Sequence, residues 1–125
     1  MRILQATAEF YPYSKTGGLA DMVSGLSSAL VKSGEEVTVV TPLYREVRDR
    51  VPGITEHGPQ FYIKLGENTF PGRWWEIESN SGVTVLFLEN EGFFNRPGLY
   101  MKGADGYWDN PERFMFFSKA VIRLA

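Results

Sequence analysis

The residues Lys15 to Asp21, Lys-Thr-Gly-Gly-Leu-Ala-Asp, combine a cation, two glycines and a carboxylate between a predicted strand and a predicted helix. Glycine has no Cβ, so the backbone N–H groups of Gly17 and Gly18 would be open to an anion at the positive end of the helix dipole. Lys15, just ahead of them, adds a full positive charge on a flexible side chain. Asp21, in the first helical turn, would bond amides of that turn or face a cleft. The segment therefore predicts a site for a phosphate-bearing ligand.

A purely structural interpretation of this segment stays open. Gly-Gly before a helix is often only a tight turn, and a neighbouring lysine is usually solvated. The chain contains no Gly-x-Gly-x-x-Gly fingerprint of dinucleotide-binding domains, and the segment is not a Walker loop, because its lysine precedes the glycines. An unrelated nucleotide-binding α/β domain is therefore a disfavoured alternative.

A strand before this segment and a helix after it must hold it in place. Residues 2–8 carry few charges, which is typical of a strand covered on both faces. From Leu19 to Ser33 apolar residues recur three or four positions apart, which predicts an amphipathic helix that ends near Gly34. The predicted buried stripe of this helix is Leu19, Met22, Val23, Leu26 and Leu30. A second strand at Val37–Thr41 completes a βαβ unit, whose two strands should be parallel.

The loop that leaves the first strand is expected at the carboxyl edge of the sheet, where ligands bind in open α/β folds. Glu9 lies in this loop. Its carboxylate either faces the cleft or caps a backbone amide, and the sequence does not decide between the two.

The middle of the chain predicts three further strands after a short helix at Tyr44–Arg50. These strands are Phe61–Leu65, Arg73–Glu78 and Val83–Leu88, separated by Gly66-Glu67-Asn68, Pro71-Gly72 and Asn80-Ser81-Gly82, where turns are expected. The second strand alternates in polarity, which indicates a half-exposed antiparallel strand, and the apolar third is expected to return to the central sheet. The fold class is therefore α/β, with a Rossmann-like, mostly parallel sheet, helices on both faces and an added antiparallel hairpin.

A loop from Glu89 to Asp109 is rich in glycine, proline and aromatic residues, and a helix is predicted after it. The loop aromatics either pack or bind sugar faces, which leaves a free-standing glucan-binding module as an alternative function. The candidate stacking residues are Phe93, Phe94, Tyr100 and Trp108. The final helix is expected to begin at Asn110-Pro111 and to bury Phe114, Phe117, Val121 and Leu124. It reaches Ala125 without the strand that should follow, so we expect a piece of a longer protein.

The composition excludes several functional classes. A net charge of −2 over 125 residues gives no general attraction for nucleic acid or an anionic membrane. Without cysteine there are no disulfides, thiolate nucleophiles or zinc–thiolate sites, and the single histidine, His57, leaves little for a metal cluster. No apolar run approaches the roughly 18 residues that span a bilayer, and no leader peptide is evident. We expect a cytoplasmic protein without a metal or a cofactor.

Three landmarks in order resemble the N-terminus of bacterial glycogen synthases and plant starch synthases. The first is Lys15-Thr-Gly-Gly-Leu-Ala-Asp21, followed by Gly34-Glu-Glu-Val-Thr-Val-Val-Thr-Pro42. The second is Phe93-Phe-Asn-Arg-Pro-Gly-Leu-Tyr100, and the third is Asp109-Asn-Pro-Glu-Arg-Phe114 with Phe117-Ser118. The resemblance covers essentially the whole chain.

The resemblance implies a retaining glucosyltransferase that moves glucose from ADP-glucose to the non-reducing end of an α-1,4-glucan, without a metal. It implies two Rossmann-like domains facing a cleft (the GT-B arrangement), of which residues 1–125 form part of the N-terminal one. The nucleotide-sugar domain is absent, so the chain alone is expected to be inactive, and the choice between ADP-glucose and UDP-glucose is decided largely outside it. By this likeness Lys15, Gly17 and Gly18 face the donor diphosphate and Asp21 shapes the cleft. The candidate residues on the acceptor side are Glu9, Phe94 and Tyr100.

Overall fold

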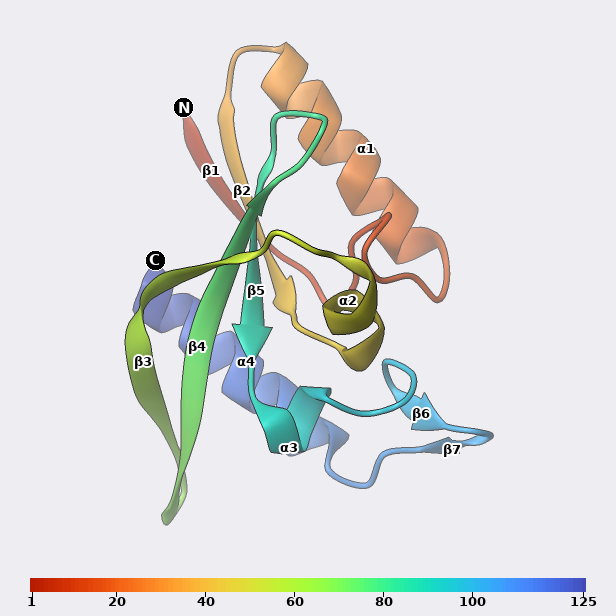
Figure 1. Cartoon of the computed structure of the whole chain (residues 1–125), viewed down its shortest axis with the longest axis vertical. Helices are drawn as coiled ribbons and strands as arrows, with labels where there is room; N and C mark the ends of the chain where they lie inside the picture. The colour runs from red at the N-terminus through yellow and green to blue at the C-terminus, as the bar shows by residue number, and fades with distance from the viewer.

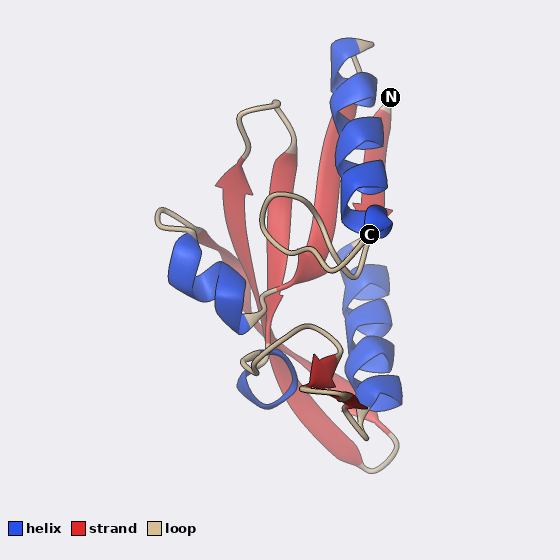
Figure 2. Cartoon of the chain, turned by 90° about the vertical axis from the view of Figure 1, so that its right-hand side faces the viewer, coloured by secondary structure: helices blue, strands red, loops and turns tan.

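The computed structural model describes residues 1–125, which form one five-stranded mixed sheet with helices on both of its faces (Figures 1 and 2). The strand order is β1-β2-β5-β4-β3. The bounds are Arg2–Ala6 for β1, Glu36–Pro42 for β2, Thr84–Glu89 for β5, Asn68–Glu78 for β4 and Thr55–Leu65 for β3. Strands β1, β2 and β5 are parallel, whereas β4 runs antiparallel to both β5 and β3. The predicted parallel βαβ unit, the hairpin between β4 and β5 and the return of β5 to the central sheet are confirmed.

The expectation that the first strand is covered on both faces is wrong. Strand β1 lies at the edge of the sheet and pairs only with β2, and its residues alternate between exposed and partly exposed. The most deeply buried strand residues lie one and two strands further in, on β2 and β5. Those with no exposed surface are Val39, Val40, Thr41, Val85, Phe87 and Leu88.

Helix α1, Gly18–Lys32, forms where it was predicted, but it presents a different face to the sheet. Its buried residues are Ala20, Val23 and Ser27. Most of the predicted stripe is exposed: Leu19 by 43%, Met22 by 56% and Leu26 by 48%. Small side chains let the helix backbone approach the strands closely, and the hydroxyl of Ser27 donates a hydrogen bond of 2.8 Å to Gln5 on β1.

The end of α1 follows the glycine signal in the sequence. Gly34 has a φ of +93°, a conformation that side chains with a Cβ rarely adopt. Its N–H donates to the carbonyl of Val31, and the N–H of Glu35 donates to the carbonyl of Leu30. This pair of hydrogen bonds is the Schellman motif, which satisfies the last carbonyls of the helix and turns the chain into β2.

Helix α4, Asn110–Leu124, covers the opposite face of the sheet, behind it in Figure 1. Phe116 of α4 reaches Gly72 on β4, and the strand register places Gly72 and Gln5 on opposite faces. The buried residues of α4 are Arg113, Phe116, Phe117 and Ala120. Of the predicted stripe only Phe117 is buried, because the helix is rotated so that Arg113 and Phe116 face inward.

The predicted turn at Pro71-Gly72 is wrong, since both residues lie inside β4. The predicted break at Gly66-Glu67-Asn68 is confirmed, because the turn of the β3–β4 hairpin falls at residues 66–67. A Cβ on Gly72 would lie 2.5 Å from the ring of Phe61. The glycine therefore marks a close approach of a ring to the backbone of a strand, not a bend.

The remaining elements are short. Helix α2 spans Arg45–Arg50, as expected, and α3 spans Glu91–Phe94. Strands β6, Met101–Lys102, and β7, Asp105–Gly106, form a small separate ribbon within the aromatic loop. None of the helices is both long and apolar enough to cross a membrane.

Candidate functional site

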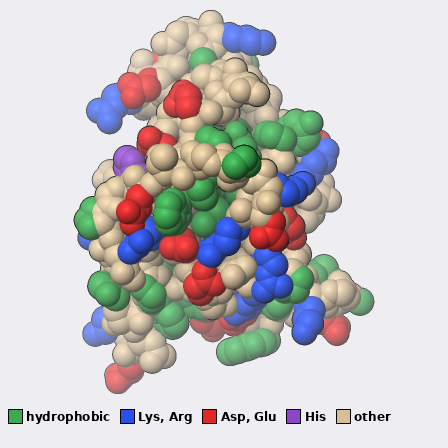
Figure 3. All heavy atoms as spheres, viewed as in Figure 1, with side chains coloured by type: hydrophobic (Ala, Val, Ile, Leu, Met, Phe, Trp, Pro, Cys, Tyr) green, Lys and Arg blue, Asp and Glu red, His purple; other side chains and the backbone are tan.

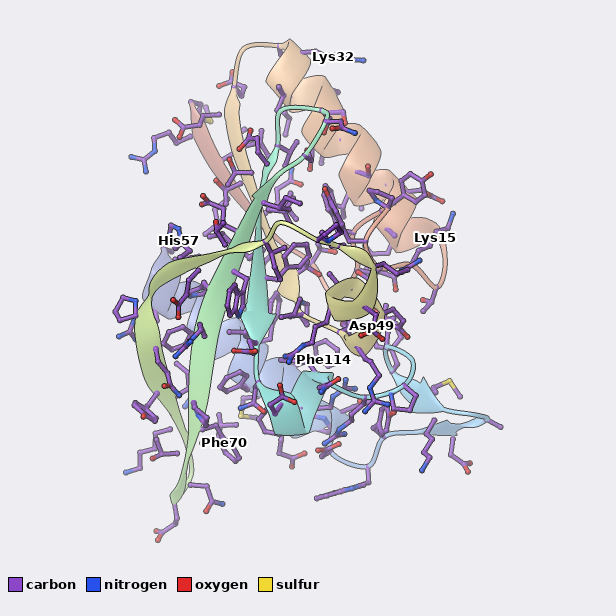
Figure 4. The ribbon with its side chains drawn as sticks, in the orientation of Figure 1. Lys15, Lys32, Asp49, His57, Phe70 and Phe114 are labelled. Atoms are coloured by element: carbon purple, nitrogen blue, oxygen red, sulfur yellow. The ribbon has the colours of Figure 1, made fainter.

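The predicted phosphate-binding segment lies at the N-terminal end of α1, where Lys15 is labelled in Figure 4. Gly17 is the N-cap and the helix begins at Gly18. The Nζ atom of Lys15 lies 2.6 Å from Oδ2 of Asp21, and both side chains are about half exposed. The hydrogen bond with Asp21 raises the pKa of the Lys15 ammonium group. The structure therefore brings Lys15 and Asp21 together as an exposed ion pair at the start of the helix.

Glu9 lies beneath this segment and is 3% exposed. Its Oε1 accepts hydrogen bonds from the backbone N–H groups of Thr16, at 3.0 Å, and Gly17, at 3.2 Å. Its Oε2 accepts from the hydroxyl of Thr16, at 2.8 Å, and from that of Tyr100, at 2.6 Å. Burial alone would raise the pKa of Glu9, but these four hydrogen bonds together outweigh burial and lower it. Glu9 is therefore held as a carboxylate that fixes the Lys15 segment from below.

This arrangement corrects one detail of the predicted anion site. The amide of Gly17 is not open, because it already donates to Glu9. The amide of Gly18 has no hydrogen-bond partner, as expected for the first residue of a helix. A Cβ on either glycine would meet no other atom within 4 Å, so the approach to the helix end is open. The sequence predicted two free glycine amides beside Lys15, whereas the structure leaves only the amide of Gly18 free.

Tyr100 comes to the site from the far end of the chain. Besides its hydroxyl contact with Glu9, its carbonyl accepts hydrogen bonds from the side chain of Asn110 and from the backbone of Tyr107. Burial, followed by the hydrogen bond to Glu9, raises the pKa of the Tyr100 hydroxyl. The sequence named Glu9 and Tyr100 as separate candidates, and the structure joins them in one hydrogen-bonded pair.

Phe94 does not belong to this site. Its side chain has no exposed surface and packs against Tyr44, with ring centroids 5.9 Å apart, and against Phe116, with centroids 6.3 Å apart. Phe93 is likewise buried. The expectation that Phe94 lies on the acceptor side is therefore wrong, because its ring fills the core between α3 and α4. Of the loop aromatics, Trp108 alone stands almost fully in solvent, at 87% exposed.

Two residues that support the site were missed by the sequence analysis. Thr16 binds Glu9 through both its amide and its hydroxyl, and its place between the lysine and the glycines was the available signal. Arg113 is completely buried and has no carboxylate partner. It donates to the carbonyls of Phe93, at 2.7 Å, and Leu99, at 2.9 Å, and to the side chain of Asn110. Burial lowers its pKa, and no simple sequence pattern predicts an arginine on the buried face of a helix.

The charges around the site do not form a field of one sign. Figure 3 shows basic and acidic side chains intermixed on the face that carries α2 and α3. Arg48, for example, lies between Glu89 and Glu91. His57 is on the surface beside Glu76, and no three His, Cys, Asp or Glu side chains are grouped so that they could hold a metal ion.

Comparison with known proteins gives one consistent result. A family profile described as the starch synthase catalytic domain matches residues 2–125. The glycogen synthase of Syntrophotalea carbinolica is 39% identical over 122 residues, which cover 98% of this chain and 25% of that protein. The glycogen synthase of Finegoldia magna is 39% identical over 125 residues, with 99% and 25% covered.

A solved structure agrees with these sequences. The catalytic domain of starch synthase IV from Arabidopsis thaliana, bound to ADP and acarbose, superposes with a TM-score of 0.76 at 27% identity. The match covers 97% of this chain and 24% of the plant chain. The chain thus spans about a quarter of the length of the relatives it matches.

Proposed function

This chain belongs to the starch synthase catalytic domain family, and from that premise we propose that it is part of a retaining glucosyltransferase. The enzyme transfers glucose from ADP-glucose to the non-reducing end of an α-1,4-glucan. Residues 1–125 form part of its N-terminal domain, and the nucleotide-sugar domain lies in the portion of the enzyme outside this chain. The 125-residue chain alone is therefore inactive. The proposal includes a cytoplasmic enzyme without a metal or a cofactor, and without nucleic acid or a membrane as partner.

The observation that carries the proposal is the exposed Lys15–Asp21 ion pair beside the unpartnered amide of Gly18. An ion pair in solvent contributes little to stability, so Lys15 exchanges Asp21 for a more highly charged ligand at small cost. A diphosphate is such a ligand, and ADP is bound in the related plant structure. As the bond from glucose to the diphosphate breaks, negative charge grows on the ADP leaving group. Lys15 and the Gly18 amide stabilise this charge.

The buried side of the segment has a positioning role in this mechanism. Glu9 accepts from the N–H groups of two consecutive peptides, Lys15–Thr16 and Thr16–Gly17, so the backbone that carries Lys15 is fixed when its side chain meets the diphosphate. Tyr100 is partly exposed while its hydroxyl is bound to Glu9. It therefore links the donor segment to the acceptor side of the cleft. Asp21, released by Lys15, shapes the same cleft.

Replacing Lys15 in the complete enzyme tests this function. With Lys15→Ala, we expect turnover with ADP-glucose to fall by about 10²–10³-fold, the usual loss for one preorganised donor at a developing charge. Lys15→Arg keeps the charge and should retain part of the activity. Lys32→Ala is the matched control, because Lys32 is an exposed lysine at the other end of the same helix (Figure 4). Turnover of Lys15→Ala equal to that of Lys32→Ala would refute the role of Lys15.

A free-standing glucan-binding module is not favoured as the main function. It used Phe93, Phe94, Tyr100 and Trp108 as stacking surfaces, and two of these four rings, Phe93 and Phe94, are buried.

A further inference from the structure

Tyr100 is held on both sides by two side chains of α4. Nη1 of Arg113 donates a hydrogen bond of 2.9 Å to the carbonyl of Leu99, in the peptide that precedes Tyr100. The side-chain NH₂ group of Asn110 donates at 3.0 Å to the carbonyl of Tyr100, in the peptide that follows it. The same Nη1 of Arg113 donates at 2.7 Å to Oδ1 of Asn110. The two peptide groups that flank the Cα of Tyr100 are therefore both fixed by this pair of side chains.

Arg113 also decides which way the side-chain amide of Asn110 points. A guanidinium group only donates hydrogen bonds and a backbone carbonyl only accepts them. The oxygen of Asn110 must therefore face Arg113, and its NH₂ group must face the carbonyl of Tyr100. Arg113 has no exposed surface and Leu99 is buried, so the contact between them stays in place when further parts of the enzyme pack on the outside of this chain.

The fixed main chain of Tyr100 directs its side chain to the Lys15 segment. The hydroxyl of Tyr100 donates at 2.6 Å to Oε2 of Glu9. The other oxygen of Glu9 accepts from the amides of Thr16 and Gly17. A continuous series of hydrogen bonds thus leads from α4, through Tyr100 and Glu9, to the backbone that carries Lys15.

We propose that Asn110 and Arg113 are positioning residues for glucosyl transfer. They place the Lys15 segment by way of Tyr100 and Glu9, and this inference rests on the proposed function for the reaction. Negative charge on the departing ADP is stabilised best by a donor that is already in place when the bond breaks, and a small displacement of such a group lowers the rate. Loss of this positioning therefore lowers kcat more than it raises the KM for ADP-glucose.

The substitution Asn110→Asp in the complete enzyme separates positioning from folding. The carboxylate keeps the shape of the side chain and still accepts from Arg113, but it cannot donate to the carbonyl of Tyr100 and repels it. The guanidinium group gains a carboxylate partner, and an acid in the first turn of α4 suits the helix dipole. We expect kcat to fall by about 10–100-fold, whereas the melting temperature does not fall. Asn80→Asp is the matched control, because it makes the same change of charge in the turn between β4 and β5 and should leave both quantities unchanged.

A double-mutant cycle with Tyr100→Phe tests the route from α4 to the segment. Phenylalanine lacks the hydroxyl that binds Glu9, so Asn110→Asp should lower kcat by no more than about twofold in that background. An equal loss in both backgrounds would overturn the route through Tyr100. A kcat for Asn110→Asp equal to that for Asn80→Asp would overturn the inference as a whole. So would a melting temperature that falls together with kcat, because Asn110 would then have only a structural role.

Hydrogen–deuterium exchange of the complete enzyme gives a readout that does not depend on glucosyl transfer. The amides of Thr16 and Gly17 donate to Glu9, and Asn110→Asp should speed their exchange by about tenfold. An unchanged exchange rate at these two amides would contradict the positioning role. A complete enzyme that transfers no glucose would overturn the proposed function alone, since the exchange of the same amides would still decide the role of Asn110.

Discussion

Replacing Glu9 by glutamine tests how the Lys15 segment is held. Glutamine has the shape of glutamate, so its oxygen can still accept from the amides of Thr16 and Gly17. Its NH₂ group would replace Oε2, which accepts from the hydroxyls of Thr16 and Tyr100. Both hydroxyls would have to turn round and become acceptors. The substitution therefore removes the charge and reverses two of the four hydrogen bonds without changing the volume of the side chain.

The expected loss of stability follows from the number of hydrogen bonds. A hydrogen bond to a charged group contributes roughly 1.5–3 kcal/mol and a neutral one about 0.5–1.5 kcal/mol, so four bonds weakened by about 1 kcal/mol each give an upper limit near ~4 kcal/mol. A buried amide is also less costly to desolvate than a buried carboxylate, which offsets part of this loss. We expect Glu9→Gln to lower the free energy of unfolding at pH 7 by about 2–3 kcal/mol.

The pH dependence gives the prediction a second, independent readout. The pKa of Glu9 is lowered in the folded protein, so the unfolded state binds its proton first as the pH falls. The stability that Glu9 contributes is complete above its unfolded pKa of about 4.3 and is lost as the pH falls through the lower, folded pKa. The difference between wild type and Glu9→Gln should therefore shrink below about pH 4, since a protonated Glu9 resembles glutamine.

Urea titrations followed by tryptophan fluorescence, at pH 7 and at several values below 4.5, would measure this difference. Glu67→Gln is the control, because Glu67 lies exposed in the turn of the β3–β4 hairpin and should change the free energy of unfolding by less than about 0.5 kcal/mol. A difference for Glu9→Gln below ~0.5 kcal/mol at pH 7 would refute the reasoning. A difference that stays constant into the acid range would refute the assignment of the ionised form.

Two further substitutions test the core. Gly72→Ala places a methyl group 2.5 Å from the ring of Phe61, so it should destabilise the protein by about 1–3 kcal/mol; an unchanged urea midpoint would contradict this contact. Arg113→Met keeps the apolar stem but leaves the carbonyls of Phe93 and Leu99 without their donors, with an expected loss of about 3–4 kcal/mol. Arg113→Lys should not restore this stability, because an ammonium group cannot reproduce the planar fork of donors, and full recovery in the same titration would show that charge alone suffices.

The elements of the fold were largely predictable because their signals are local. The spacing of apolar residues located α1, the glycine at position 34 located its end, and the proline at 111 lies in the first turn of α4. Helix capping and β-strand alternation act over a few residues, so a single sequence contains them. The Lys15–Asp21 ion pair was not predicted in this way, because Asp21 was expected to bond amides of the first helical turn or to face a cleft.

The choice between the faces of an element could not be predicted in this way. The pattern of α1 contains a stripe of large apolar residues and a stripe of small ones, and the small stripe, with Ala20 and Ser27, contacts the sheet. Likewise, the pair Pro71-Gly72 is typical of a turn, but the role of Gly72 is set by its contact with the ring of Phe61 on the neighbouring strand. In both cases the deciding contact comes from a distant part of the chain.

The sequence by itself determined the family, the order of the elements and the position of a cationic segment at the start of a helix. Only the tertiary structure decided that Glu9 caps the amides of that segment, that Tyr100 completes its hydrogen bonds and that Phe94 is buried while Trp108 is exposed. The physical reason is the distance along the chain over which each interaction acts. Backbone preferences and hydrophobic periodicity act between near neighbours in the chain, whereas burial and the partners of a buried carboxylate depend on which distant segments fold against it.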